Sequence, residues 1–142
     1  MEISKIKIMK KIISLMVLMT LLSFKTLTNS CKEIAFQAVQ VQSVLREDLY
    51  WIYIKNPTLE NESNYTDAKY VEDLLLKIVK EDNSTDNETI SEAARVQSVL
   101  KEELYMWYLN NGSVAAQNIY VDAKYVESLI LKIIKDKNSD NH

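Results

Sequence analysis

The sequence predicts an all-α protein built as a tandem duplication of a helical hairpin. Three observations predict this fold class. The chain of 142 residues has a single glycine and a single proline, and so few helix breakers favour helices. Apolar residues recur at spacings of three and four. Finally, residues 41–84 align without a gap on residues 96–139, a period of 55, with 24 of the 44 positions identical, which indicates an internal duplication.

The first 30 residues are typical of an export signal that is removed before Cys31. Several lysines lie near the beginning of this segment, and the apolar run Ile12–Phe24 follows them. A run of this length is shorter than the roughly 20 residues that span a bilayer. An uncleaved anchor helix is the alternative interpretation.

Cys31 is the only cysteine, so it has no partner within the chain for a disulfide. The stretch LTNSCKE around it resembles the lipobox region of bacterial lipoproteins, and this resemblance implies a lipid on Cys31. The segment departs from the usual pattern, because Thr28 stands where leucine is expected and Lys25 places a charge close to the site. Plain secretion with a spare thiol is the alternative.

Residues 31–84 form the first predicted hairpin. Its first helix carries an apolar stripe, and Pro57 ends it, because proline disfavours helical geometry in the residue before it. We expect a polar loop over Asn56–Asn64. The second helix is expected to begin at Asp67, the first residue of the segment DAKYVE, with its carboxylate as the N-cap. The first stripe comprises Ile34, Ala38, Val41, Val44, Leu45, Leu49 and Ile52, and the second Val71, Leu74, Leu75 and Ile78.

Residues 85–142 form the second hairpin, after a polar linker at Glu81–Glu88. The run Thr89–Glu92 is a candidate capping box for its first helix, and Gly112 ends that helix at the repeat position of Pro57. A second loop is expected over Asn111–Asn118. The last helix is expected to begin at the second DAKYVE segment, capped by Asp122, with Val121 and Val126 as a hydrophobic staple.

The two hairpins are expected to form one domain, since one hairpin alone buries too little apolar surface to be stable. Leu76 and Leu131 lie roughly opposite the main stripes of the second helices on a helical wheel. A helix that is apolar on two sides packs against two neighbours. We therefore expect a compact four-helix bundle or a short two-repeat stack.

Charge excludes one class of partner. Residues 31–142 carry 12 basic and 19 acidic residues, a net charge of −7. Such a surface repels nucleic-acid phosphates and anionic headgroups. Contact with a membrane is therefore expected through the N-terminal lipid only.

Catalytic and metal-binding patterns are missing from the sequence. His142 is the only histidine and the last residue, so no nucleophilic triad can be built around it. Neither metal-ligand spacing nor a glycine-rich phosphate loop is present. We expect a protein that is not an enzyme and that uses no cofactor and no metal.

The tyrosines suggest binding instead, because all eight fall at matched repeat positions. The helical wheel turns Tyr50 away from the core stripe, next to Ile54, and Tyr105 and Leu109 repeat this arrangement. Tyrosine is a good residue for binding a partner, since it is large and has few rotatable bonds. These four residues are the candidate binding site, with a structural role at the edge of the core as the alternative.

The resulting functional hypothesis is an exported, lipid-anchored module of the cell envelope that binds a protein, with self-association as a second use of two alike surfaces. The layout of a lipid anchor followed by tandem helical units is similar to that of phage superinfection-exclusion lipoproteins, which leaves exclusion or toxin immunity as an alternative. A secreted eukaryotic glycoprotein or effector is another. It is suggested by five Asn-X-Ser/Thr sequons, at Asn61, Asn64, Asn83, Asn87 and Asn111.

Overall fold

A computed structural model describes residues 31–81 and 87–140. The predicted export signal and His142 lie outside these residues. The described chain forms four helices, α2 (Cys31–Lys55), α3 (Leu59–Lys80), α4 (Asn87–Asn111) and α5 (Val114–Asp140). The predicted all-α fold with four helices is confirmed.

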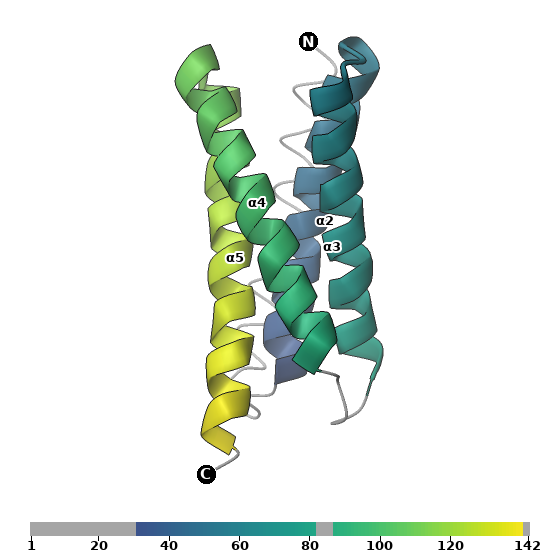
Figure 1. The fold of residues 1–142 in the computed structure, drawn as a ribbon, viewed down its shortest axis with the longest axis vertical. Coiled ribbons are helices and arrows are strands. Elements are labelled where there is room, and N and C mark those ends of the chain that lie inside the picture. The colour runs from purple at the N-terminus through teal and green to yellow at the C-terminus, as the bar shows by residue number, and fades with distance from the viewer. Residues whose placement is uncertain (1–30, 82–86, 141–142) are drawn as a thin grey trace.

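The four helices close into a bundle (Figure 1). Helix α2 packs on α3 and α5, and α4 packs on the same two helices, so each helix has two neighbours. Because the last helix returns to the first, the hairpins form a closed bundle and not a linear stack. The turns of both hairpins lie at one end, which we call the turn end, and the described chain begins at the other, which we call the Cys31 end.

The core consists of two apolar clusters. The larger one lies toward the Cys31 end and takes buried residues from all four helices, among them Ile34, Leu75, Ile90 and Ile130. The smaller one lies toward the turn end and centres on Leu45. Its other buried members are Leu49, Ala68, Leu100, Leu104, Ile119 and Ala123. Both clusters draw on both hairpins, so neither hairpin has a core of its own.

The two segments that the repeat preserves best, VQSVL and DAKYVE, face each other within each hairpin. The buried amide Nε2 of Gln42 donates a hydrogen bond of 3.0 Å to the carbonyl oxygen of Ala68. The amide of Gln97 makes the same bond, also 3.0 Å, to the carbonyl oxygen of Ala123. The small alanine side chain lets the two helices come close enough for this contact.

Ion pairs reinforce the same contact one turn further along. The Nε of Arg46 lies 2.8 Å from a carboxylate oxygen of Glu72, and Lys101 Nζ lies 3.0 Å from Glu127. The bond to Glu127 raises the pKa of Lys101 above its usual value. The segment DAKYVE is thus one half of a helix–helix contact, which explains why it recurs.

The expected start of the second helix in each hairpin is wrong. Helix α3 begins at Leu59, eight residues before Asp67, and α5 begins at Val114, eight residues before Asp122. The N-cap of α3 is Thr58, whose hydroxyl accepts a hydrogen bond from Asn61 N at 3.1 Å. Both aspartates therefore lie inside a helix, and neither is an N-cap residue.

The local capping motifs of the second hairpin are wrong for the same reason. Helix α4 begins at Asn87, so Thr89 lies inside the helix, and Glu92 pairs with Arg95 at 2.8 Å instead of closing a capping box. Val121 lies within α5 and is exposed, so it forms no staple at a helix start with Val126.

The expected loops are correspondingly shorter. Only residues 56–58 separate α2 from α3, and residues 112–113 separate α4 from α5. Asn64, expected in a loop, is buried in α3 with 3% of its surface exposed, so a glycan on it is incompatible with this packing. Each second helix does pack on two neighbours, but Leu131 is 52% exposed and belongs to neither core cluster.

Candidate functional site

The candidate site lies at the turn end of the bundle, where apolar side chains are exposed on both hairpins. On the first hairpin these are Tyr50, Trp51 and Ile54 of α2 and Leu59, the first residue of α3. On the second hairpin the residues at the same repeat positions are exposed: Tyr105, Met106, Leu109 and Val114. We call these two sets the tip surfaces. Each lies on the outside of the bundle and belongs to no core cluster.

The exposure of these residues is unusual for their type. Leu59 and Val114 expose 85% and 72% of their surface, and Met106 and Leu109 expose more than half. Nine of the fourteen large exposed apolar residues of the described chain lie within 47–67 and 102–122, the two stretches around the hairpin turns. Such a concentration of exposed apolar groups marks an interaction surface more often than scattered single residues do.

A set of aromatic contacts holds each tip tyrosine in place. The ring of Tyr65 on α3 lies 5.4 Å from that of Tyr50 and stacks at 6.3 Å on that of Tyr53. In the second hairpin Tyr120 lies 5.0 Å from Tyr105, in the equivalent arrangement. Ring pairs at these distances are stabilising. The tip tyrosines are therefore partly ordered before any partner binds, which lowers the entropy cost of binding.

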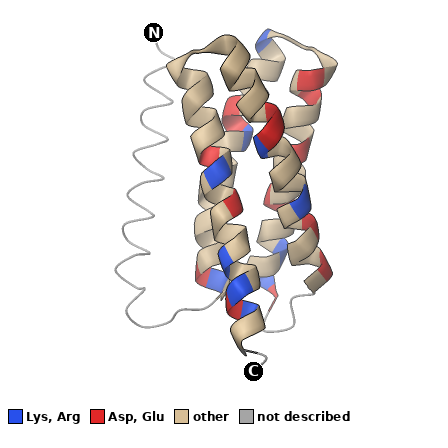
Figure 2. Cartoon of the chain, turned by 60° about the vertical axis from the view of Figure 1, so that its left-hand side comes forward, with Lys and Arg blue, Asp and Glu red and all other residues tan. Residues whose placement is uncertain are grey.

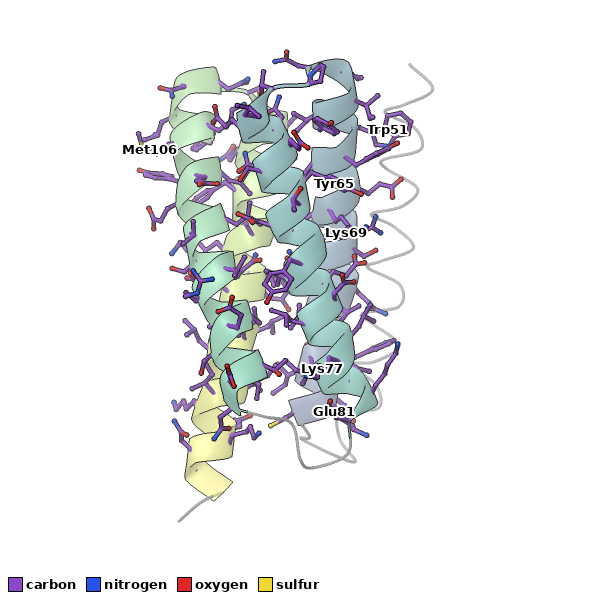
Figure 3. All side chains as sticks on the ribbon, turned by 45° about the vertical axis from the view of Figure 1, so that its right-hand side comes forward. Trp51, Tyr65, Lys69, Lys77, Glu81 and Met106 are labelled. Carbon is purple, nitrogen blue, oxygen red and sulfur yellow. The ribbon has the colours of Figure 1, made fainter. Side chains whose placement is uncertain are left out.

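The two tip surfaces face different sides of the molecule. Their main carriers, α2 and α4, do not pack on each other in the described bundle, but lie at opposite corners of it. Figure 3 shows Trp51 and Met106 near the turn end on opposite sides, while Lys77 and Glu81 lie near the Cys31 end. One molecule therefore presents two alike surfaces to two different directions.

The predicted lipid attachment site lies at the far end of the molecule. Cys31 is the first residue of α2, is half-buried and packs against the larger core cluster. Tyr50 and Ile54 lie near the end of the same helix. At 1.5 Å per residue, this helix places them roughly 28–35 Å from Cys31.

A pair of carboxylates lies between the hairpins. Burial raises the pKa of Glu103 on α4, and the negative charges of Asp67 and Glu60 on α3 raise it further. Burial likewise raises the pKa of Asp67, although Arg95 opposes this effect. One oxygen of Glu103 is buried without a hydrogen-bond partner.

Acid–base catalysis uses carboxylates with raised pKa values, but residues 31–81 and 87–140 contain no histidine to share a proton. The same residues contain no group of three His, Cys, Asp or Glu side chains that could hold a metal ion. No helix among them is long and apolar enough to cross a membrane.

The sequence placed four of the eight tip residues in the candidate site: Tyr50, Ile54, Tyr105 and Leu109. The structure exposes Tyr50 with Ile54, and Tyr105 with Leu109, on the outside of the bundle, which is the direction that the helical wheel predicts. Both pairs lie at the turn end. It adds Trp51 and Met106, which lie beside the tyrosines. It also adds Leu59 and Val114, which the sequence analysis assigned to loops.

No protein-family model matches this chain, and neither a curated protein nor a solved structure matches it at a significant level.

Proposed function

We propose that this protein is a lipid-anchored module of the cell envelope that binds another protein through its tip surfaces. One observation carries the proposal. The same four exposed apolar positions recur in both hairpins, at the end of the bundle opposite Cys31. The two copies differ at nearly half of their aligned positions. Both nevertheless have an apolar side chain at each of these four positions.

The placement of the surfaces suits this role. With a lipid on Cys31, the Cys31 end of the bundle lies at the membrane and the turn end points away from it. Apolar groups at the turn end then meet proteins of the envelope or surroundings and not the anchoring bilayer. Aromatic anchors that are already partly ordered supply binding energy at low entropic cost.

Mass spectrometry of the mature N-terminus tests the anchor. We expect a chain that begins at Cys31 and carries the mass of a lipid on that residue. An unmodified thiol, or cleavage elsewhere, would remove the anchor from the proposal but would leave the tip surfaces as its binding part.

Site-specific photo-crosslinking in the host cell tests the binding. A photo-reactive residue at Met106 is compared with one at Leu131, since these apolar side chains have similar exposures of 56% and 52% but lie in different parts of the bundle. We expect a protein adduct from position 106 and from Trp51, and none from position 131. Equal adducts from positions 106 and 131 would contradict binding through the tip.

A further inference from the structure

The charge of the protein is distributed unevenly along the bundle. The turn-proximal residues, 47–67 and 102–122, hold eight acidic residues and one lysine, a net charge of −7. All other residues of 31–142 together hold eleven acidic and eleven basic residues and are neutral. Figure 2 shows most of the blue lysine and arginine positions in the half of the bundle toward the C-terminus. The whole net charge therefore lies in the part of the chain that carries the tip surfaces.

Nearby basic residues offset little of this charge. Arg46 and Lys101, which border the turn-proximal residues, lie 2.8 Å from Glu72 and 3.0 Å from Glu127, two acids outside the region. Lys101 also lies 3.4 Å from Glu102, an exposed acid within it. Lys55 is the only basic residue within the region itself. Exposed acids flank the apolar groups: Glu60 and Glu62 follow Leu59 on α3, and Glu102 precedes Tyr105 and Met106 on α4. A concentrated charge of one sign attracts a partner of the opposite sign and sets its orientation.

We propose that each tip surface binds a cationic amphipathic segment of a partner protein. This inference rests on the proposed function and names the chemistry of the partner. Apolar side chains of the segment lie on Tyr50, Trp51 and Ile54, or on their equivalents in the second hairpin, while its lysines and arginines face the surrounding acids. Because the two surfaces lie at opposite corners, one molecule binds two such segments.

The test uses residues 31–142 with Cys31 replaced by serine. Both core clusters lie within this part of the chain, so it contains all the packing that the described fold needs. The probes are three short synthetic peptides with a helical amphipathic pattern, made of Leu and Lys, of Leu and Glu, or of Gln and Lys. Titration calorimetry measures affinity and stoichiometry at low and high salt.

We expect two Leu/Lys peptides to bind per protein, more weakly at high salt because screening shortens the reach of the acidic field. The double variant Trp51→Ser, Met106→Ser loses affinity by about tenfold or more, as is usual when central aromatic or apolar anchors are removed. Leu131→Ser, which removes a similarly exposed leucine elsewhere, binds as the parent does. A second double variant, Glu47→Gln with Glu102→Gln, keeps the apolar surface and weakens binding only at low salt.

Four outcomes would overturn the inference. If the Leu/Glu peptide binds as tightly as the Leu/Lys peptide, the partner is not selected by charge, although tip binding itself stands. If the Gln/Lys peptide binds as tightly, the apolar residues play no part. If the Trp51/Met106 variant and Leu131→Ser behave alike, or no peptide binds, then the tip surface is not the binding site for such a segment. Circular dichroism of each variant shows that the fold is kept.

Discussion

At the scale of single residues, the two buried glutamines are the most informative side chains of the core. Gln42 and Gln97 are fully buried, and each uses its NH₂ group in a bond to a helix carbonyl, while its own Oε1 has no protein partner. A net hydrogen bond contributes about 0.5–1.5 kcal/mol, whereas an unpaired buried polar atom costs about 1–3 kcal/mol. The glutamines therefore fix how the helices of each hairpin pair, without adding much stability.

This balance gives a prediction for Gln97. Gln97→Leu keeps the volume and removes both the bond and the unpaired oxygen, so we expect the free energy of unfolding to change by less than about 1 kcal/mol. Gln97→Ala leaves a cavity and is expected to lower it by roughly 2–3 kcal/mol. Urea unfolding of both variants measures the difference. A loss from Gln97→Leu as large as that from Gln97→Ala would show that the hydrogen bond, and not the packing, dominates at this site.

The carboxylates between the hairpins predict a pH dependence of stability. The pKa values of Glu103 and Asp67 in the folded chain both lie above their usual values, so ionising them costs free energy in the folded state. This cost disappears as the pH falls from neutral through the raised pKa values toward the usual value of about 4. We expect Glu103→Gln to raise the melting temperature at pH 7 and to reduce the gain that the parent shows on mild acidification.

Glu102→Gln is the matched control for this prediction. Glu102 is the chain neighbour of Glu103, but its side chain is 67% exposed and lies 3.4 Å from Lys101. Removing its charge takes away a weak surface attraction, so the melting temperature should stay the same or fall slightly. If both variants stabilise the protein equally at pH 7, the effect comes from the overall negative charge and not from the half-buried pair of Glu103 and Asp67.

At the scale of helices, the observed starts predict which residues act as caps. Thr58→Ala removes an acceptor for a backbone N–H at the start of α3 and is expected to lower the free energy of unfolding by about 1 kcal/mol. Ser113→Ala should do the same for α5, because Ser113 Oγ accepts from Ala116 N at 3.1 Å. Asp67 is not an N-cap residue, and its carboxyl group has a raised pKa. Asp67→Ala should therefore not lower the free energy of unfolding. Thermal melting of the three variants tests this prediction. A lower melting temperature for Asp67→Ala alone would contradict the observed start of α3.

The end of α4 gives a second prediction at this scale. Gly112 has a positive φ of 65°, and a Cβ added to it meets no atom within 4 Å. The cost of Gly112→Ala therefore comes from the backbone alone and is expected to be about 1 kcal/mol. Gly112→Asn should cost less, because asparagine tolerates this conformation better. Equal stabilities of the alanine variant and the parent, measured by thermal melting, would contradict the left-handed turn.

Helix ends were more predictable from the sequence than helix starts. Pro57 and Gly112 end their helices through the backbone geometry of a single residue, which is visible in the sequence. The start at Leu59 was not visible, because the first two turns of α3 carry few apolar residues. The start at Val114 was missed although Ala116 and Ile119, in the first two turns of α5, are buried. Residues 59–66 contain one buried side chain, Asn64, and it is polar. Apolar periodicity therefore begins late, and Asp67 resembles a cap although it lies two turns inside the helix.

Residues inside long helices could be placed from the sequence, whereas residues at the helix starts could not, and this decides which site residues the sequence reveals. Tyr50 and Tyr105 lie in long regular helices, where the helical wheel places each side chain correctly. Leu59 and Val114 begin helices whose starts were expected eight residues later. Only the three-dimensional structure shows that these two residues lie with the tyrosines at the turn end. The contact between the segments VQSVL and DAKYVE was not expected either, because it depends on how two helices are aligned along their length.

At the scale of the whole molecule, the duplication produces a bundle with two alike sides and two unlike ends. Each core cluster takes side chains from both hairpins, and each second helix packs on both first helices. The tip surfaces and the net negative charge lie toward one end, and Cys31 lies at the other. A bundle of this kind presents two alike surfaces while it remains a single folding unit.

The core that the two hairpins share gives the last prediction. Leu100 of α4 is fully buried in the cluster it shares with Leu45 and Leu49 of α2, so Leu100→Ala is expected to lower the free energy of unfolding by about 2–4 kcal/mol. Because the core is shared, hydrogen exchange should show the amides of α2 losing as much protection as those of α4. Leu131→Ala removes an exposed leucine and should change neither helix. If only α4 and α5 lost protection, the first hairpin would have to be stable by itself. We do not expect this result, because half of the shared core buries too little apolar surface for a stable fold.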